Sequence, residues 1–223
     1  MITRLTAVVA VCALPVLASC RQPESSGPVL VDPHSAEFVQ RRDDVVRSAV
    51  ELEARIAAAA SSAVEPDPAQ QVVCRAGNRG PKGVDAFDSV CGMQRLSVVK
   101  TADPGRALLA IDDALGKLGY TGTWQGGTEP IDKDDVRSGK VPSSRISFAS
   151  YGAGGLTVDL QVGHRGDRPS YVVRTSLGTG YFNDAGGSGW AAAGAQTAPL
   201  AESVLAVTVT DPAFIEKPPT DGG

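Results

Sequence analysis

The chain has 223 residues, with 21 lysines and arginines against 25 aspartates and glutamates, so its formal net charge is −4. This length allows one domain with its own core, and the absence of a basic stripe argues against nucleic-acid binding driven by phosphate contacts. Aromatic residues make up only 5% of the chain, whereas glycines number 25 and prolines 15, which favours loops over aromatic stacking platforms.

The first 20 residues have the features of a targeting segment. Arg4 precedes an apolar run over residues 5–17, which is too short for a permanent membrane-spanning helix and has the length of a signal-peptide core. Residues 17–20, LASC, resemble the lipobox of bacterial lipoproteins. The resemblance implies that residues 1–19 are removed and that the Cys20 thiol carries palmitate-type lipid, which anchors the protein on the extracytoplasmic face of the cell membrane. The alternative is an ordinary secretory signal in which Cys20 is incidental.

The composition adds a taxonomic impression to this resemblance. The mature chain is rich in alanine, glycine, valine and arginine, as proteins from GC-rich bacterial genomes are. Together with the lipobox, this makes the chain similar to an actinobacterial surface lipoprotein. The resemblance is confined to residues 1–20 and implies nothing about the fold of the rest.

A tether and a long helix are expected after the cysteine. Residues 20–33 contain three prolines and almost no periodicity, so they are expected to be a flexible tether. Between residues 34 and 64 apolar side chains recur on one helical face, with Ser35 as N-cap and Pro66 preventing continuation. We expect this face to pack on the domain's own sheet. A partner-binding or lipid-surface helix is disfavoured, because both signs of charge alternate on its polar face.

The cysteines separate by position. Cys12 lies in the leader and Cys20 in the lipobox, which leaves Cys74 and Cys91 as a pair in an oxidising compartment. A disulfide is predicted, stabilising the fold by about 3 kcal/mol in the chain-entropy description. A metal site would need further ligands, and the mature chain offers only His34 and His164. No metal and no cofactor is therefore expected.

The remaining pattern predicts an α+β domain over residues 34–211. Strands are expected at 71–75 and 93–101, followed by a helix that Asp103 caps, Pro104 begins and Gly119 ends. Residues 126–144 read as a polar loop, and three alternating segments, 145–151, 156–162 and 170–177, predict an antiparallel meander. Residues 120–125 and 204–209 are further strand candidates, Trp190 should anchor an irregular segment over 178–198, and the chain should fray over 212–223. We expect an antiparallel sheet of about five to six strands with two helices packed on one face.

Several residue groups invite a chemical interpretation, and each has a simpler one. The glycine-rich loop at 77–83 lacks the hydroxyl residue and the helix of a phosphate-binding loop. An acidic group around residue 132 has the charge but not the spacing of a calcium loop, and a glycosidase pair would need Asp159 and Glu202 to face each other across a cleft. The acidic group comprises Glu129, Asp132, Asp134 and Asp135.

His164 and Ser170 lie near one another in sequence but without a nucleophile elbow, so His164 is expected to be an exposed turn residue.

These observations favour a non-enzymatic, lipid-anchored domain that binds a protein partner or a small apolar ligand at the cell envelope, with no nucleic acid. No residue is predicted to be catalytic. The alternative is a hydrolase of cell-wall or lipid substrates with a carboxylate-based site, and a third interpretation is a structural partner in an envelope complex.

Overall fold

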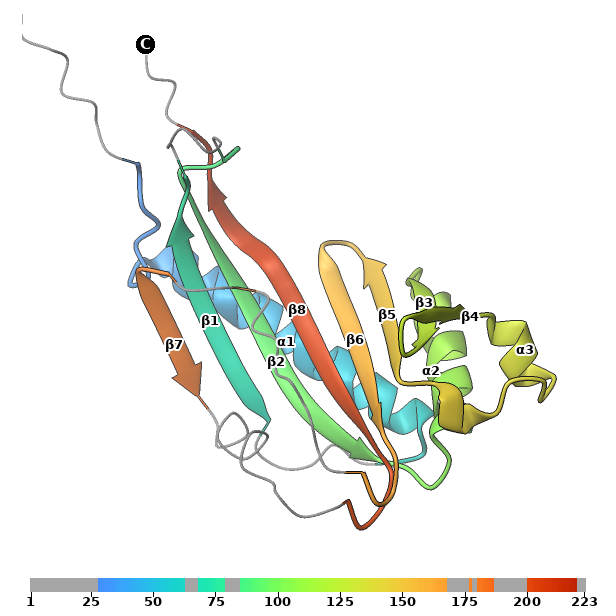
Figure 1. Cartoon of the computed structure of the whole chain (residues 1–223). Coiled ribbons are helices and arrows are strands. Elements are labelled where there is room, and N and C mark those ends of the chain that lie inside the picture. Colours follow the sequence, from blue (N-terminus) through green and yellow to red (C-terminus); the bar gives the residue numbers. More distant parts are fainter. Residues whose placement is uncertain are drawn as a thin grey trace, which may run out of the picture.

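The computed structural model describes residues 28–62, 68–78, 85–167, 177, 180–186 and 200–219 (Figure 1). They form one eight-stranded antiparallel sheet, in the order β4-β3-β5-β6-β8-β2-β1-β7, with three α-helices and a 3₁₀ turn. The α+β class is confirmed, but the sheet has eight strands rather than five to six. The elements in chain order are α1 (Ala36–Ala59), β1 (Ala69–Ala76), β2 (Ser89–Lys100), α2 (Pro104–Lys117), β3 (Thr121–Gly126), β4 (Glu129–Ile131), α3 (Lys133–Arg137), η1 (Ser143–Arg145), β5 (Phe148–Ala153), β6 (Leu156–Gly163), β7 (Phe182–Gly186) and β8 (Val204–Lys217).

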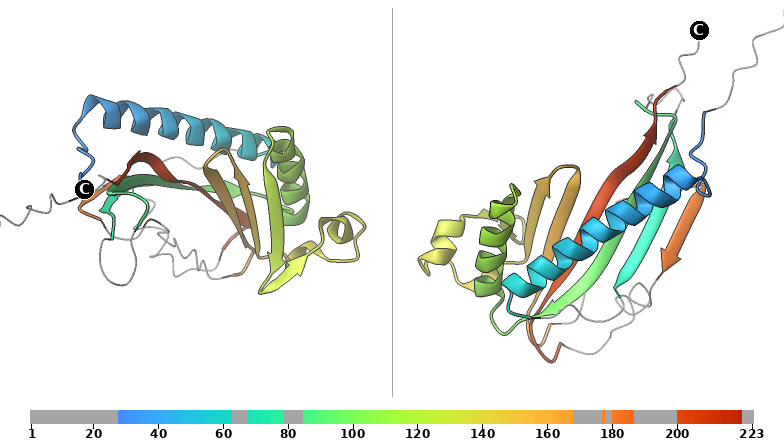
Figure 2. Two further views of the ribbon diagram at one scale, coloured as in Figure 1. Left: turned by 90° about the horizontal axis from the view of Figure 1, so that it is seen from above. Right: turned by 180° about the vertical axis from the view of Figure 1, so that it is seen from behind.

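Helix α1 lies lengthwise across one face of the sheet, against β2 and β8 (Figure 2). Ser35 caps it as predicted, since its side-chain oxygen accepts a hydrogen bond from the Phe38 backbone N–H at 3.2 Å. Its 24 residues span about 36 Å at the usual helical rise. Its packing on the sheet is confirmed, because Phe38, Leu52 and Ile56 are buried there, whereas Val39 and Val50 on the outer face are exposed. The helix ends at Ala59 rather than near residue 64, and Ser61 has a left-handed backbone with φ of 54°.

A buried ion pair joins α1 to the sheet. Glu53 is 3% exposed and accepts hydrogen bonds at 3.2 Å on both carboxylate oxygens from Arg95 of β2, which is 8% exposed. Arg95 also donates to the side-chain oxygen of Gln70 at 2.7 Å. Burial raises the pKa of Glu53, while the Arg95 guanidinium opposes this shift. A helical pattern based on apolar residues does not reveal this pair.

Helix α2 begins and ends where the sequence predicts. Asp103 accepts a hydrogen bond from the Arg106 backbone N–H at 3.1 Å, Pro104 occupies the first turn, and Gly119 has φ of 84°. The main contacts of α2 are with α1, β3 and the 3₁₀ turn rather than with the central strands. Two helices side by side on one face are therefore not confirmed, and α3 is a third helix.

The predicted disulfide is confirmed between Cys74 and Cys91. These residues lie directly opposite each other in the antiparallel pairing of β1 and β2. One residue further along, Gly92 lies at an irregularity in the pairing of β2 with β8. A Cβ at Gly92 would lie 2.6 Å from the Leu177 side chain and 2.8 Å from the Pro212 carbonyl oxygen, so glycine is required there.

Both expected ends of the domain need correction. Strand β8 continues to Lys217 instead of ending near residue 209 with a frayed tail from 212, because its last residues pair with the start of β2 and bury Ile215. At the other end, part of the expected tether packs on the domain. Val31 is 1% exposed, and its backbone N–H donates to the Ser89 hydroxyl at 2.9 Å.

The stretch expected to be a polar loop at 126–144 contains β4, α3 and η1 instead. A hairpin between β3 and β4 turns at Gly127, whose φ is 66°, and Asp132 caps α3. The meander is confirmed for β5 and β6, but the strand expected over 170–177 lies outside the described residues except for Leu177, as does Trp190. Strand β7 falls within the segment expected to be irregular.

Candidate functional site

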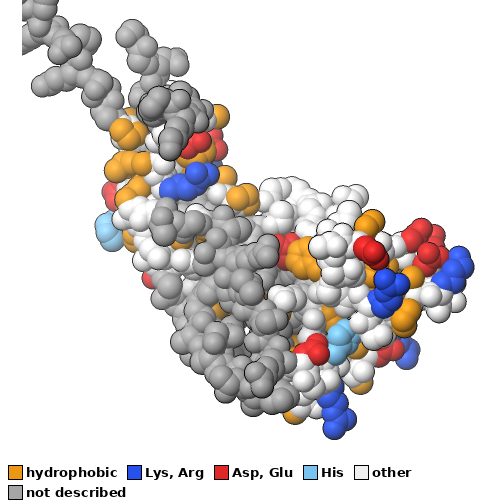
Figure 3. All heavy atoms as spheres, viewed as in Figure 1, with side chains coloured by type: hydrophobic (Ala, Val, Ile, Leu, Met, Phe, Trp, Pro, Cys, Tyr) orange, Lys and Arg blue, Asp and Glu red, His pale blue; other side chains and the backbone are white. Residues whose placement is uncertain are grey.

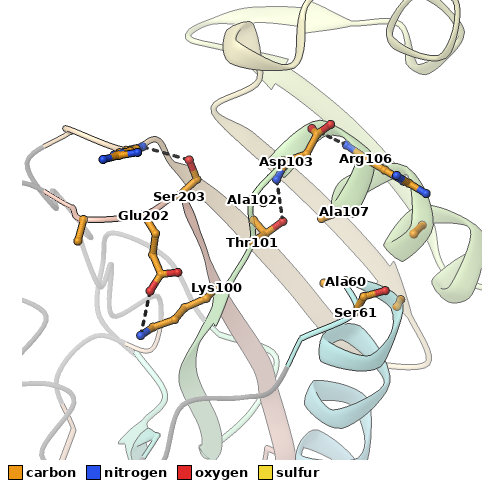
Figure 4. Close-up of a pocket in the computed structure, with 14 residues that line it drawn as sticks. Ala60, Ser61, Lys100, Thr101, Ala102, Asp103, Arg106, Ala107, Glu202 and Ser203 are labelled. Atoms are coloured by element: carbon orange, nitrogen blue, oxygen red, sulfur yellow. Dashed lines mark hydrogen bonds and ion pairs between the residues drawn. The ribbon is translucent and has the colours of Figure 1, made fainter.

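An open basin of about 880 Å³ lies at the C-terminal end of α1 (Figure 4). Five segments surround it: the end of α1, the chain after β2, the first turns of α2, the turn after β6 and the chain entering β8. These segments meet because β2 and α1 both end at this pole of the molecule. The lining residues are Ala59, Ala60, Ser61, Lys100, Thr101, Ala102, Asp103, Arg106, Ala107, Ala110, Arg165, Ala201, Glu202 and Ser203.

The two carboxylates of the basin are already engaged. Glu202 pairs with Lys100 at 3.0 Å, and Asp103 is the N-cap of α2. Figure 4 shows the Lys100–Glu202 pair apart from the Asp103–Arg106 contact. The α2 N-terminus is thus capped by a side chain of its own and offers no ready anion site.

The two arginines of the basin, unlike its carboxylates, make their recorded hydrogen bonds through the backbone. Arg106 and Arg165 use their backbone N–H groups to donate to Asp103 and to the Ser203 hydroxyl. Within the described part of the chain, neither guanidinium has an ion pair or a hydrogen bond. Among the described lining residues there are three cations and two carboxylates, so 3 − 2 leaves a net charge of +1.

The lining combines small apolar side chains with hydroxyl and charged groups. Six alanines give the basin small apolar side chains, and neither histidine nor cysteine is among the described lining residues. The Ser203 hydroxyl oxygen accepts a hydrogen bond from the Arg165 backbone N–H at 3.1 Å.

A second hollow, of about 390 Å³, lies where β3, β4 and α3 meet. The ammonium of Lys133 pairs with Asp112 of α2, and it lies 5.8 Å from the ring centroid of buried Trp124. The guanidinium of Arg137 contacts the carboxylates of Asp112 at 3.5 Å and Asp113 at 2.9 Å. Positive and negative side chains accordingly alternate over this end of the molecule (Figure 3).

A buried tyrosine lies beneath this cluster. Tyr151 is 2% exposed, and its hydroxyl accepts a hydrogen bond from the Trp124 indole N–H at 2.8 Å. Burial and the Asp112 carboxylate raise the pKa of Tyr151 well above its usual range, so this hydroxyl stays protonated near neutral pH. It therefore joins β3 to β5 rather than acting as a base.

The acidic residues around position 132 do not converge on a cation site. Each has its own partner: Asp132 caps α3, Asp134 pairs with Arg137, Asp135 with Lys140 and Glu129 with Arg145. No group of three or more histidine, cysteine or acidic side chains within the described residues could hold a metal ion.

Asp159 and Glu202, which were considered as a glycosidase pair, do not lie close to each other. Glu202 lies two residues before β8, whereas Asp159 of β6 pairs in register with Thr208 and accepts a hydrogen bond from Ser150. Six residues of extended chain, roughly 20 Å, separate the two positions along β8, which exceeds the spacing of glycosidase carboxylates.

The two histidines lie at opposite ends of the fold. His34 is exposed in the turn before α1. His164 is half-buried rather than exposed as expected, in a turn where its backbone N–H donates to Asp167 at 2.8 Å.

Ser170 and residues 79–83 of the glycine-rich loop lie outside the described residues, whereas the Gly77 backbone N–H donates to the Asp88 carbonyl oxygen.

Sequence reasoning did not select Arg106 or Arg165. Arg165 was part of a turn, and Arg106 belonged to the polar face of a helix, so only the tertiary structure places both on the lining of one basin. No protein family, no curated protein sequence and no solved structure matches this chain. No helix in the described ranges is long and apolar enough to cross a membrane.

Proposed function

We propose that this protein is a lipoprotein, anchored through Cys20 on the extracytoplasmic face of the cell membrane, whose domain is a non-catalytic binding module. The basin at the C-terminal end of α1 is its ligand site. The observation that carries this proposal is the placement of the basin relative to the point where the N-terminal segment joins the domain.

That point is at the opposite pole. Val29 and Val31 hydrogen-bond to Asp88 and Ser89, where β2 begins, whereas Lys100 at the end of β2 lines the basin. Helix α1 runs between the same two poles, so about 36 Å separates them. A chain anchored at Cys20 would present the basin away from its own bilayer, to molecules of the surrounding envelope.

The length of the connecting segment supports this orientation. Eight residues lead from Cys20 to Pro28, and even a fully extended segment of that length reaches less than about 30 Å. The pole that carries Val29 therefore stays near the membrane in every orientation of the domain, whereas the basin can lie far from the membrane.

Two measurements test the proposal. Cys20→Ser removes the acylated thiol, so the protein should leave the detergent phase on phase partitioning, whereas Ser19→Ala, which keeps the thiol, should not change partitioning. Attachment of the unaltered protein should also survive high salt, because two acyl chains hold by apolar burial.

Orientation is measured by energy transfer from a dye on the protein to acceptor lipids in vesicles. Dyes on Leu30→Cys, at the tether pole, and on Ala102→Cys, in the basin, provide a matched pair of exposed sites. Transfer should be strong from position 30 and weak from position 102. Equal transfer from both, or unchanged partitioning of the Cys20→Ser variant, would contradict the proposed function.

A further inference from the structure

We propose that the pole of the domain that carries the N-terminal tether contacts the lipid bilayer through the tether patch, an apolar surface formed by Val29, Leu30 and Tyr181. Its partner is the region of the bilayer where headgroups meet acyl chains, whatever the charge of the headgroups. This inference rests on the proposed function for the lipid anchor. It adds a second membrane contact, which fixes the orientation of the domain on the bilayer.

The tether patch brings exposed apolar side chains together at one place. Val29, Leu30 and Tyr181 are 45%, 48% and 42% exposed and are three of the six large apolar residues exposed in the described chain. The Tyr181 hydroxyl donates to the Val31 carbonyl oxygen at 3.1 Å, so Tyr181 lies beside the segment that carries Val29 and Leu30. Figure 3 shows apolar side chains at this pole. Single exposed apolar residues need no explanation, whereas neighbouring ones are typical of a contact surface.

Hydrogen bonds hold the backbone of this segment on the domain. The Val29 N–H donates to the Asp88 carboxylate at 3.2 Å, and the Val29 carbonyl oxygen accepts from the Ser89 hydroxyl at 2.9 Å. Val31, the next residue but one, is buried. The side chains of Val29 and Leu30 are therefore held at the surface, at a fixed place relative to the sheet.

The length of the tether indicates what covers the patch. Eight residues lead from Cys20 to Pro28, so a chain anchored at Cys20 keeps Val29 within roughly 30 Å of the bilayer. A contact that is too weak to form from solution becomes intramolecular at such a distance, because the tether raises the effective concentration of the bilayer. The bilayer is therefore the apolar surface that this pole meets first.

The chemistry of the pole suits the interface rather than anionic headgroups. A tyrosine combines an apolar ring with a polar hydroxyl, and such side chains favour the boundary between headgroups and acyl chains. Charges of both signs lie nearby, and Lys217 is paired with Glu37 at 3.4 Å. Attraction to the patch should therefore come from apolar burial and persist at high salt.

Quenching of tryptophan fluorescence by lipids with brominated acyl chains tests the inference, because bromine quenches only at short range. The probe is Leu30→Trp, and the control is Val50→Trp, since Val50 is also 45% exposed but lies about 20 Å along α1 from its start. The full chain is anchored in zwitterionic vesicles through acylated Cys20. The emission of the unaltered protein is subtracted, which removes the signals of Trp124 and Trp190.

Failure of the natural anchor leaves this measurement intact. If Cys20 is not acylated, a maleimide lipid in the same vesicles couples to the Cys20 thiol of a Cys12→Ser chain. Detergent partitioning thus reports on the anchor of the proposed function, and quenching reports separately on the tether patch.

Brominated lipid should quench the tryptophan at position 30 and not the one at position 50, at low and at high salt. Adding Val29→Asp to the Leu30→Trp chain should remove most of the quenching, because it places a charge in the contact while keeping the backbone hydrogen bonds of residue 29. Adding Val50→Asp should leave the quenching unchanged. Circular dichroism verifies that each variant is folded.

The inference is overturned if the tryptophan at position 30 is quenched no more than the one at position 50. It is also overturned if Val29→Asp leaves the quenching unchanged, or if quenching requires anionic lipid, which would assign the contact to headgroup charge.

Discussion

The basin and the hollow beside α3 both contain arginine, but the arginines of the two regions differ in whether carboxylates of the described chain compensate their charge. In the hollow, Arg137 contacts the carboxylates of three aspartates and Lys133 pairs with Asp112. In the basin, Arg106 and Arg165 have no such partner among the described residues. The ion pairs of the hollow hold α3 against α2, whereas no described ion pair holds the two arginines of the basin.

The comparison shows why concavity alone does not identify a binding site. An ion pair within the protein lowers the attraction for an external anion, because a ligand would have to displace the internal carboxylate. The buried pair of Glu53 and Arg95 is the extreme case of compensation, since both side chains are almost fully removed from water. Changes to these pairs should cost stability, and changes to the basin should cost binding.

The largest effect is expected for Glu53→Ala. It leaves the Arg95 guanidinium buried without its carboxylate, so the free energy of unfolding should fall by about 3–5 kcal/mol. Urea denaturation followed by circular dichroism measures this change. The double variant Glu53→Leu with Arg95→Met replaces both charges by apolar groups and should recover most of the loss; a double variant as unstable as Glu53→Ala would contradict this account.

A smaller change should follow from pH. Burial raises the pKa of Glu53 in the folded state, so the folded chain binds this proton more tightly than the unfolded chain does. The stabilisation that comes from this tighter proton binding is full below the unfolded pKa of about 4.3 and is lost as the pH rises through the folded pKa. The difference in stability between the unaltered protein and Glu53→Gln, which does not titrate, should therefore decline over this range, as measured by denaturation at a series of pH values.

Breaking the compensated cluster should have a moderate effect. Asp112 is only 14% exposed and pairs with Lys133, so Asp112→Ala should lower the free energy of unfolding by about 1–2 kcal/mol. Asp113→Ala is the control, because Asp113 is 64% exposed and its pairing with Arg137 is screened by water. Equal losses in the two variants would remove the distinction between a buried and an exposed partner.

The smallest effect on stability is expected in the basin. Arg106→Gln and Arg165→Gln remove no ion pair, so each should change the free energy of unfolding by no more than about 0.5 kcal/mol. The same urea titrations measure this. A loss comparable with that of Asp112→Ala would show that these arginines support the fold, and the contrast between the two hollows would fail.

Features fixed by neighbouring residues were predictable from the sequence. Ser35 and Asp103 cap their helices through hydrogen bonds to backbone groups three residues away. Gly119 ends α2 through its own backbone conformation, and the disulfide followed from the cysteine count together with the expected compartment. The two caps and the helix end needed only local chemistry, and the disulfide needed only the number of cysteines and the compartment.

Features that depend on distant pairing were missed. Ile215 is buried because the end of β8 pairs with Cys91 and its neighbours, and nothing near residue 215 signals that partner. Strand β7 was missed for the same reason, since it is held at the sheet edge by β1. The basin is the clearest case, because its arginines follow two different strands and only the sheet order brings them to one pole.

The return of β8 to the start of β2 has a practical consequence for engineering this protein. The Asp88 backbone N–H donates to the Lys217 carbonyl oxygen at 2.9 Å, and Val29 donates to the carboxylate of the same Asp88 at 3.2 Å. The described chain therefore starts and stops at one end of the molecule (Figure 1). An epitope tag or fluorescent protein fused after Gly223 would be attached at that end and would leave the basin unobstructed, whereas an insertion at the turn of Gly166 would be placed beside Arg165 and would block it.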